Sequence, residues 1–199
     1  MSAEKPRERP ILFNDQMVRA ILEGRKTVTR RAVKDTGFYA IDAAIHGNDV
    51  ALREREALST RCPFGQPGDR LWVRETWGLQ VRSYGGGAGE FIVYRATNPD
   101  AIYCRSSEGR EYPVKWKPSI HMHRHSSRIL LEITAVRVER LQDITPNQCI
   151  AEGAWREKDK ELGRGQEAIA AFADLWRSTG GDWDANPWVW VIEFKRVAP

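Results

Sequence analysis

The chain has 199 residues, a formal net charge of +4 and a pI of about 9.1, which permits a nucleic-acid or nucleotide partner but excludes histone-like basicity. This length fits one domain with an ordinary buried core. Three widely spaced cysteines argue against a disulfide framework and favour a reducing compartment, which predicts a cytoplasmic protein. The charged residues 1–9 predict a disordered arm rather than a signal peptide, and no apolar run approaches the ~20 residues that cross a membrane.

A short strand and an amphipathic helix are predicted first along the chain. Residues 10–13 are apolar enough for the strand. Asn14 or Asp15 can cap a helix that runs to about Glu23, and Gly24 ends it.

The next segment holds two further strands on either side of a weak pattern. Residues 26–31 are predicted to be extended. Between 33 and 61 we expect a variable excursion with one short helix at 50–58. The Pro-Gly-Asp turn at 67–69 leads into an alternating strand at 70–75.

The middle of the chain predicts several short β elements. The glycine-rich segment 83–89 reads as a mobile loop, followed by strands at 91–95 and 112–116. The strongest strand pattern covers 128–140. Its apolar set slips by one residue near 134–135, which predicts a bulge.

Two helices and a last strand complete the pattern. Thr145 as cap with Pro146 predicts a helix start, and Gly153 ends that helix. A second helix is predicted at 166–178, and a central strand, apolar on both faces, at 188–194. The order of elements predicts an α+β fold, a small mixed β-barrel with a few peripheral helices.

The basic run from Gly24 to Arg31 is the most informative motif. It holds four cations, and no acid occurs between Glu23 and Asp35. Because these like charges repel one another, the run favours an anion or an electron-rich group at this place. The three arginines should also make Lys26 easier to deprotonate. The alternative is a solvated basic strand edge.

These motifs resemble the ASCH domain, a branch of the PUA-like β-barrels. The resemblance covers about residues 10–197 and is strongest with a longer subgroup found in phage and prophage genomes. It implies one domain, 10–199, with a cleft for RNA or a nucleoside and with insertions near 34–62 and 80–127. The matching segments are 21–31, 67–77, 117–122, 141–144, 152–153 and 188–194.

Some small ASCH proteins are amidohydrolases that deacetylate N4-acetylcytidine, and the resemblance carries their catalytic set onto Lys26, Thr29 and Glu152. Chemically, Thr29 is a nucleophile that needs a base, and Lys26 serves as that base only if its pKa falls from ~10.4 toward ~7–8. Glu152 in contact with Lys26 would oppose that fall, so we expect it near the leaving nitrogen or holding the nucleobase. Residues three apart share a cleft only if the strand bends.

A wider set is predicted to bind substrate or nucleic acid. Trp72 and Trp77 can stack bases and Arg74 can bind phosphate, but the tryptophans fit a core better, and Arg74 can equally pair with Glu75. The full set is Arg25, Arg30, Arg31, Trp72, Arg74, Glu75, Trp77, Ser119 and His121.

No metal or cofactor is predicted. His121, His123 and His125 would share a face only on a strand, and neighbouring arginines disfavour a cation. Cys149 reads as core, and no glycine loop has the pattern that cradles phosphates. The expected partner is a nucleoside or RNA, with no membrane. Two alternatives to amide hydrolysis stay open, a non-catalytic RNA-binding module and a metal-independent ribonuclease.

Overall fold

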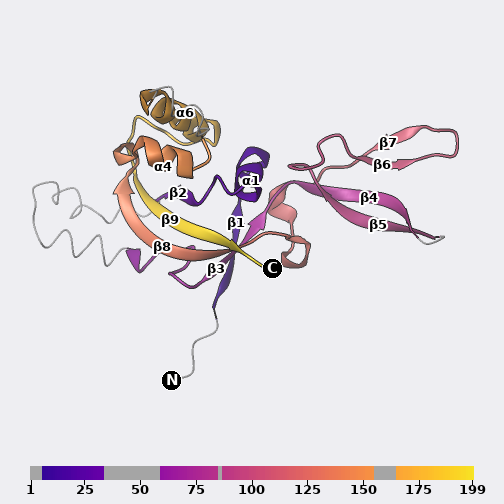
Figure 1. The fold of residues 1–199 in the computed structure, drawn as a ribbon, viewed down its shortest axis with the longest axis horizontal. Coiled ribbons are helices and arrows are strands. Elements are labelled where there is room, and N and C mark those ends of the chain that lie inside the picture. Colours follow the sequence, from indigo (N-terminus) through magenta and orange to yellow (C-terminus); the bar gives the residue numbers. More distant parts are fainter. Residues whose placement is uncertain (1–5, 34–58, 85–86, 155–164) are drawn as a thin grey trace, which may run out of the picture.

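The computed structural model describes residues 6–33, 59–84, 87–154 and 165–199. Its core is one curved five-stranded sheet in the order β1-β3-β8-β9-β2 (Figure 1). Strands β1 and β3 are parallel, and the other neighbours are antiparallel. The strands are β1 (Glu8–Leu12), β2 (Val28–Ala32), β3 (Arg70–Arg74), β8 (Leu130–Arg140) and β9 (Trp188–Val197).

Strand β9 lies between β8 and β2 and is buried on both faces, as its sequence predicts. Val189 and Val191 face one apolar cluster, while Trp190 and Ile192 face the other. The predicted slip in β8 is confirmed, because the register with β9 shifts between Ile133 and Ala135. This bulge lets one long strand keep apolar side chains on the core side while it bends.

Among the described residues, three α-helices flank the sheet. They are α1 (Asp15–Leu22), α4 (Pro146–Ala151) and α6 (Gly165–Ser178). The predicted cap of α1 is confirmed, since Asn14 accepts a hydrogen bond from the Met17 amide at 2.9 Å. Thr145 and Gln148 form a reciprocal capping box on α4. Helices α4 and α6 pack together over β9 and β2 through the cluster that contains Cys149 and Phe172.

The two edge strands of the sheet approach each other without pairing. No backbone ladder joins β1 to β2 among the described strands, yet the Arg31 guanidinium of β2 donates to the Leu12 carbonyl of β1 at 2.6 Å. The mixed α+β class is confirmed, with several sheets and few helices. The hydrogen-bonded order of the main sheet is open.

An arm of two hairpins projects from the sheet (Figure 1). One hairpin is β4 (Trp77–Tyr84) with β5 (Gly87–Tyr94), and the other is β6 (Ile102–Arg105) with β7 (Glu111–Pro113). The predicted loop at 83–89 is therefore wrong for its described residues, which belong to a hairpin. The glycines suggested a loop, but these residues are held in the hairpin by pairing across its two strands.

Further predictions concern the N-terminal arm, the helix at 50–58 and membrane spans. Glu8 and Arg9 belong to β1, so the expected disordered arm does not reach residue 9. The predicted helix at 50–58 lies outside the described residues. Within the described ranges, no helix is both long enough and apolar enough to cross a membrane.

Candidate functional site

The site begins where the loop after α1 docks against the end of α4. The amides of Arg25 and Lys26 donate to the Ala20 carbonyl at 2.9 and 3.0 Å, and the Thr27 amide donates to the Ala151 carbonyl at 2.8 Å. Gly153 allows this approach, with φ of +76° and an absent Cβ that would lie 2.8 Å from Ala20 Cβ. Glu152 is thereby carried against Lys26.

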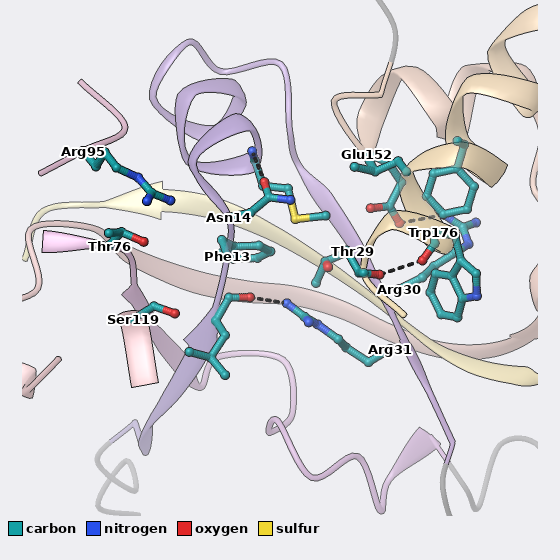
Figure 2. Close-up of a pocket in the computed structure, with 15 residues that line it drawn as sticks. Phe13, Asn14, Thr29, Arg30, Arg31, Thr76, Arg95, Ser119, Glu152 and Trp176 are labelled. Carbon is teal, nitrogen blue, oxygen red and sulfur yellow. Dashed lines mark hydrogen bonds and ion pairs between the residues drawn. The ribbon is translucent and has the colours of Figure 1, made fainter. Parts of the chain in front are cut away.

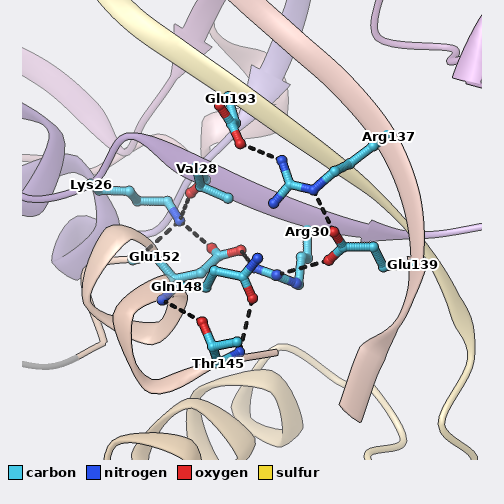
Figure 3. Close-up of polar contacts among 9 residues, drawn as sticks. All are labelled: Lys26, Val28, Arg30, Arg137, Glu139, Thr145, Gln148, Glu152 and Glu193. Carbon is cyan, nitrogen blue, oxygen red and sulfur yellow. Dashed lines mark hydrogen bonds and ion pairs between the residues drawn. The ribbon is translucent and has the colours of Figure 1, made fainter. Parts of the chain in front are cut away.

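Lys26 is buried, and its side chain has no solvent-exposed area. Its Nζ donates to the Val28 carbonyl at 2.7 Å, the Glu152 carbonyl at 3.0 Å and Glu152 Oε2 at 2.7 Å (Figure 3). Nζ also lies 5.6 Å from the centroid of the Phe13 ring. Three acceptors match the three N–H groups of an ammonium, so this geometry suits the charged form.

The contact between Lys26 and Glu152 contradicts the expectation that Glu152 stands apart from the lysine. The pKa of Lys26 is nevertheless lowered, because complete burial outweighs the opposing effect of Glu152 and is helped by Arg31 and Arg30. The predicted direction of the pKa shift is thus the one found, but burial is its main cause and not the neighbouring arginines.

Glu152 joins a chain of alternating charges. Its Oε1 accepts from Arg30 at 3.1 Å, and Arg30 also contacts Glu139 at 3.3 Å. Arg137 then pairs with both Glu139 and Glu193 (Figure 3). The side chain of Arg30 has no exposed area, so carboxylates from distant parts of the chain neutralise the basic run. A solvated basic edge is excluded for Lys26 and Arg30.

A cavity of about 270 Å³ opens between the end of β1, the start of α1, strand β2 and helix α6 (Figure 2). It lies at the gap between the two edge strands of the sheet. Its lining residues are Leu12, Phe13, Asn14, Met17, Thr29, Arg30, Arg31, Thr76, Arg95, Ser119, Glu152, Phe172, Leu175, Trp176 and Thr179.

Two groups in this cavity carry reactive chemistry. Thr29 is buried, and its hydroxyl makes no hydrogen bond within the part of the chain that the structure describes. Glu152 presents its carboxylate, held on one oxygen by Lys26 and on the other by Arg30. A hydroxyl without a partner beside a fixed carboxylate can act on a polar substrate atom placed between them.

Aromatic rings and one exposed cation complete the cavity. Arg30 lies over the Phe172 ring at 5.9 Å, and Arg31 lies over the Phe13 ring at 5.2 Å. Arg95 keeps 45% of its side chain exposed while it pairs with Asp15 at 2.6 Å. The cavity therefore combines flat apolar walls with fixed polar groups, as sites for small planar ligands do.

The structure brings part of the predicted set together. Five predicted residues line the cavity: Thr29, Arg30, Arg31, Ser119 and Glu152. Lys26 lies behind it, in contact with Glu152. Arg25 is partly exposed outside the cavity and pairs with Glu23. His121 is exposed on a 3-10 turn and does not line the cavity either.

The matching segment 67–77 takes a structural role in the described geometry. Trp72 and Trp77 are each 8% exposed and do not line the cavity. Arg74 stacks on Trp72 at 4.9 Å. Glu75 is paired with Arg128 through two contacts of 2.9 Å, which corrects the expected Arg74–Glu75 pair. Burial raises the pKa of Glu75.

Sequence reasoning missed several residues that line the cavity. Asn14, Thr76 and Arg95 come from three separate segments between helices and strands and carry no common motif. Phe172 and Trp176 lie in the helix predicted at 166–178, but nothing in its pattern indicates that part of this helix borders a cavity. Only the tertiary contact of α6 with β2 reveals it.

No group of three or more His, Cys, Asp or Glu side chains among the described residues is placed to hold a metal ion. His123 and His125 stack with ring centroids 5.6 Å apart, on a 3-10 segment and not on the strand their spacing would need. Cys149 is fully buried, and burial raises its pKa to about 11, so it is a thiol at neutral pH.

Comparison with protein-family models, curated proteins and solved structures found no match for this chain.

Proposed function

We propose that this protein is an ASCH-type amidohydrolase that removes the acyl group from the N4 nitrogen of N4-acetylcytidine. The observation that carries the proposal is the cavity that Thr29 and Glu152 both line, with Lys26 held against Glu152 behind it. No cofactor takes part in it.

Thr29 is the nucleophile and Lys26 the base. Nζ donates to the carbonyl of Val28, the residue before Thr29, so the base is held against the strand that carries the nucleophile. A neutral amine has two N–H groups and one lone pair, so loss of one proton frees one of its three donor directions. The lowered pKa of Lys26 favours this neutral form relative to that of an exposed lysine.

The reaction then has two steps. Thr29 Oγ1 attacks the acetyl carbon while its proton passes to Lys26. The bond from that carbon to N4 breaks, the nitrogen gains the proton, and cytidine leaves. Water next hydrolyses the acetyl ester on Thr29 and gives acetate. Glu152 holds Lys26 and Arg30 in place and accepts a hydrogen bond from the nucleobase.

Two features favour a small ligand over a phosphate chain in this cavity. Arg30 and Lys26 are buried and bonded to Glu152, and Arg31 is bonded to the Leu12 carbonyl. Cations that are already neutralised inside the protein offer little to a phosphate backbone, whose binding depends on displacing its counterions. The ribonuclease alternative, which needs these cations near a phosphorane, has less support.

The proposal extends to the fold. We infer a PUA-like barrel in which β1 and β2 are the strands on either side of an open seam, bridged by Arg31. The ligand cavity occupies that seam. The arm of two hairpins corresponds to most of the expected insertion near 80–127.

Turnover of N4-acetylcytidine, followed by chromatography of cytidine and acetate, tests the function. Wild type should release both products, and Lys26→Met should reduce kcat by at least about a hundredfold, the usual contribution of a general base. His121→Ala is the matched control, because His121 was predicted in the site but lies outside the cavity. Equal rates for Lys26→Met and His121→Ala would reject the assignment.

A further inference from the structure

The projecting arm holds a second cavity of about 630 Å³, separate from the charged network. It lies between the two hairpins, which are tied by a hydrogen bond from the Gln80 side chain to the Ile102 carbonyl at 2.8 Å. Its lining residues are Leu79, Glu90, Tyr103, Cys104, Tyr112, Pro113, Lys115 and Lys117.

The lining combines aromatic rings with two lysines, and Lys117 Nζ lies 4.6 Å from the centroid of the Trp77 ring. Tyr112 is 44% exposed. Lys115 and Lys117 are exposed and have no ion pair within the described ranges. The one carboxylate of the lining, on Glu90, accepts from the Tyr103 hydroxyl at 2.8 Å. With two lysines against one carboxylate, the formal charge of the lining is positive.

The arm cavity adjoins the cavity at the sheet through a short bridge. Trp77 and Lys117 exchange two backbone hydrogen bonds, of 3.2 and 2.7 Å. The residue before Trp77, Thr76, lines the cavity at the sheet, and so does Ser119, two residues after Lys117. The two cavities are thus lined by residues that neighbour the same bridge, an arrangement that suits a ligand longer than one nucleoside.

We propose that the arm cavity binds single-stranded nucleic acid, with a base against Tyr103 and Tyr112 and the phosphates on Lys115 and Lys117. Aromatic rings interleaved with cations are what a single strand needs, since every base has a face that stacks and every linkage carries a charge. Binding of nucleic acid by the arm does not depend on catalysis in the other cavity. That the acylated cytidine lies within the strand rests on the proposed function.

Fluorescence anisotropy with a labelled single-stranded RNA 12-mer, and with DNA of the same sequence, tests the arm. Tyr112→Leu keeps apolar area but removes the ring, and should weaken binding about fivefold or more. Lys115→Gln with Lys117→Gln should weaken binding and reduce the slope of log affinity against log salt by about 0.7 per lost phosphate contact. Arg110→Gln, an exposed cation of the same arm outside the cavity, is the control and should bind as wild type.

Circular dichroism and a thermal melt confirm that each variant is folded. Stronger binding of RNA than of DNA would identify contacts to the 2′-hydroxyl, and equal binding would assign the site to stacking and phosphates. Wild-type affinity in Tyr112→Leu with an unchanged salt slope in the lysine variant would overturn the proposal and indicate an apolar occupant such as a protein segment. If the wild-type protein does not turn over the free nucleoside but still binds the single strand, only the proposed amidohydrolase activity is rejected.

Discussion

Replacing Glu152 by Gln tests the charge arrangement at the centre of the site. The substitution keeps the shape of the side chain but removes the carboxylate that holds Lys26 at 2.7 Å and Arg30 at 3.1 Å. Neither cation has exposed side-chain area, so water cannot replace the lost partner. The amide NH2 of the new Gln must also point at one of the two donors.

The magnitude follows from burial. Breaking a buried ion pair by removing one partner costs about 3–5 kcal/mol of unfolding free energy. For a chain of this size, that corresponds to a fall in Tm of roughly 6–20 °C. The matched surface control is Glu132→Gln, which breaks a 2.7 Å pair with Lys195, a side chain that is 60% exposed. That substitution should cost less than about 1 kcal/mol.

Urea denaturation at neutral pH measures both losses. The double variant Lys26→Met/Glu152→Gln removes the pair together and should recover about 0.5–3 kcal/mol relative to the sum of the single variants. The reasoning is refuted if Glu152→Gln costs no more than Glu132→Gln, or if the two single losses simply add.

Three other predictions use the same site. Burial lowers the pKa of Lys26 in the folded chain. At a pH between that lowered value and about 10.5, the unfolded chain binds a proton at this lysine that the folded chain has released, so the free energy of unfolding should rise with pH. Lys26→Met should remove this part of the pH dependence in urea denaturation. Gly153→Ala should cost about 1–3 kcal/mol, since φ is +76° and the new Cβ would meet Ala20; an unchanged midpoint in urea would contradict the close approach. The kcat for N4-acetylcytidine should rise with pH as Lys26 loses its proton, and a flat profile in wild type would exclude a lysine base.

Local patterns predicted much of the fold. The helix caps at Asn14 and Thr145 and the bulge near residue 134 depend on neighbouring residues alone, so sequence was sufficient for them. The central position of β9 follows from apolar residues on both faces. The hairpin β4–β5 was missed because its glycines suggest a loop, whereas its stability comes from pairing across the strands.

The site was predictable in its residues but not in its arrangement. The lack of acids near the basic run suggested an external anion, yet the anions are Glu152 and Glu139, more than a hundred residues later in the chain. Ion pairs between residues so far apart in the sequence cannot be recognised from local patterns. Lys26 and Thr29 were expected to share a cleft only if the strand bends. The structure places Lys26 in the loop before β2 begins at Val28, and of the two residues only Thr29 lines the cavity.

The measurement that tests the central claim most directly is a single-turnover assay of N4-acetylcytidine with enzyme in excess, comparing wild type, Thr29→Ser and Thr29→Val. Valine replaces the unbonded hydroxyl with a methyl group of similar size, and serine retains a nucleophile. The account predicts cytidine release by wild type and the serine variant, and none by the valine variant at unchanged stability. Release at the wild-type rate by Thr29→Val, or no release by wild type, would contradict it.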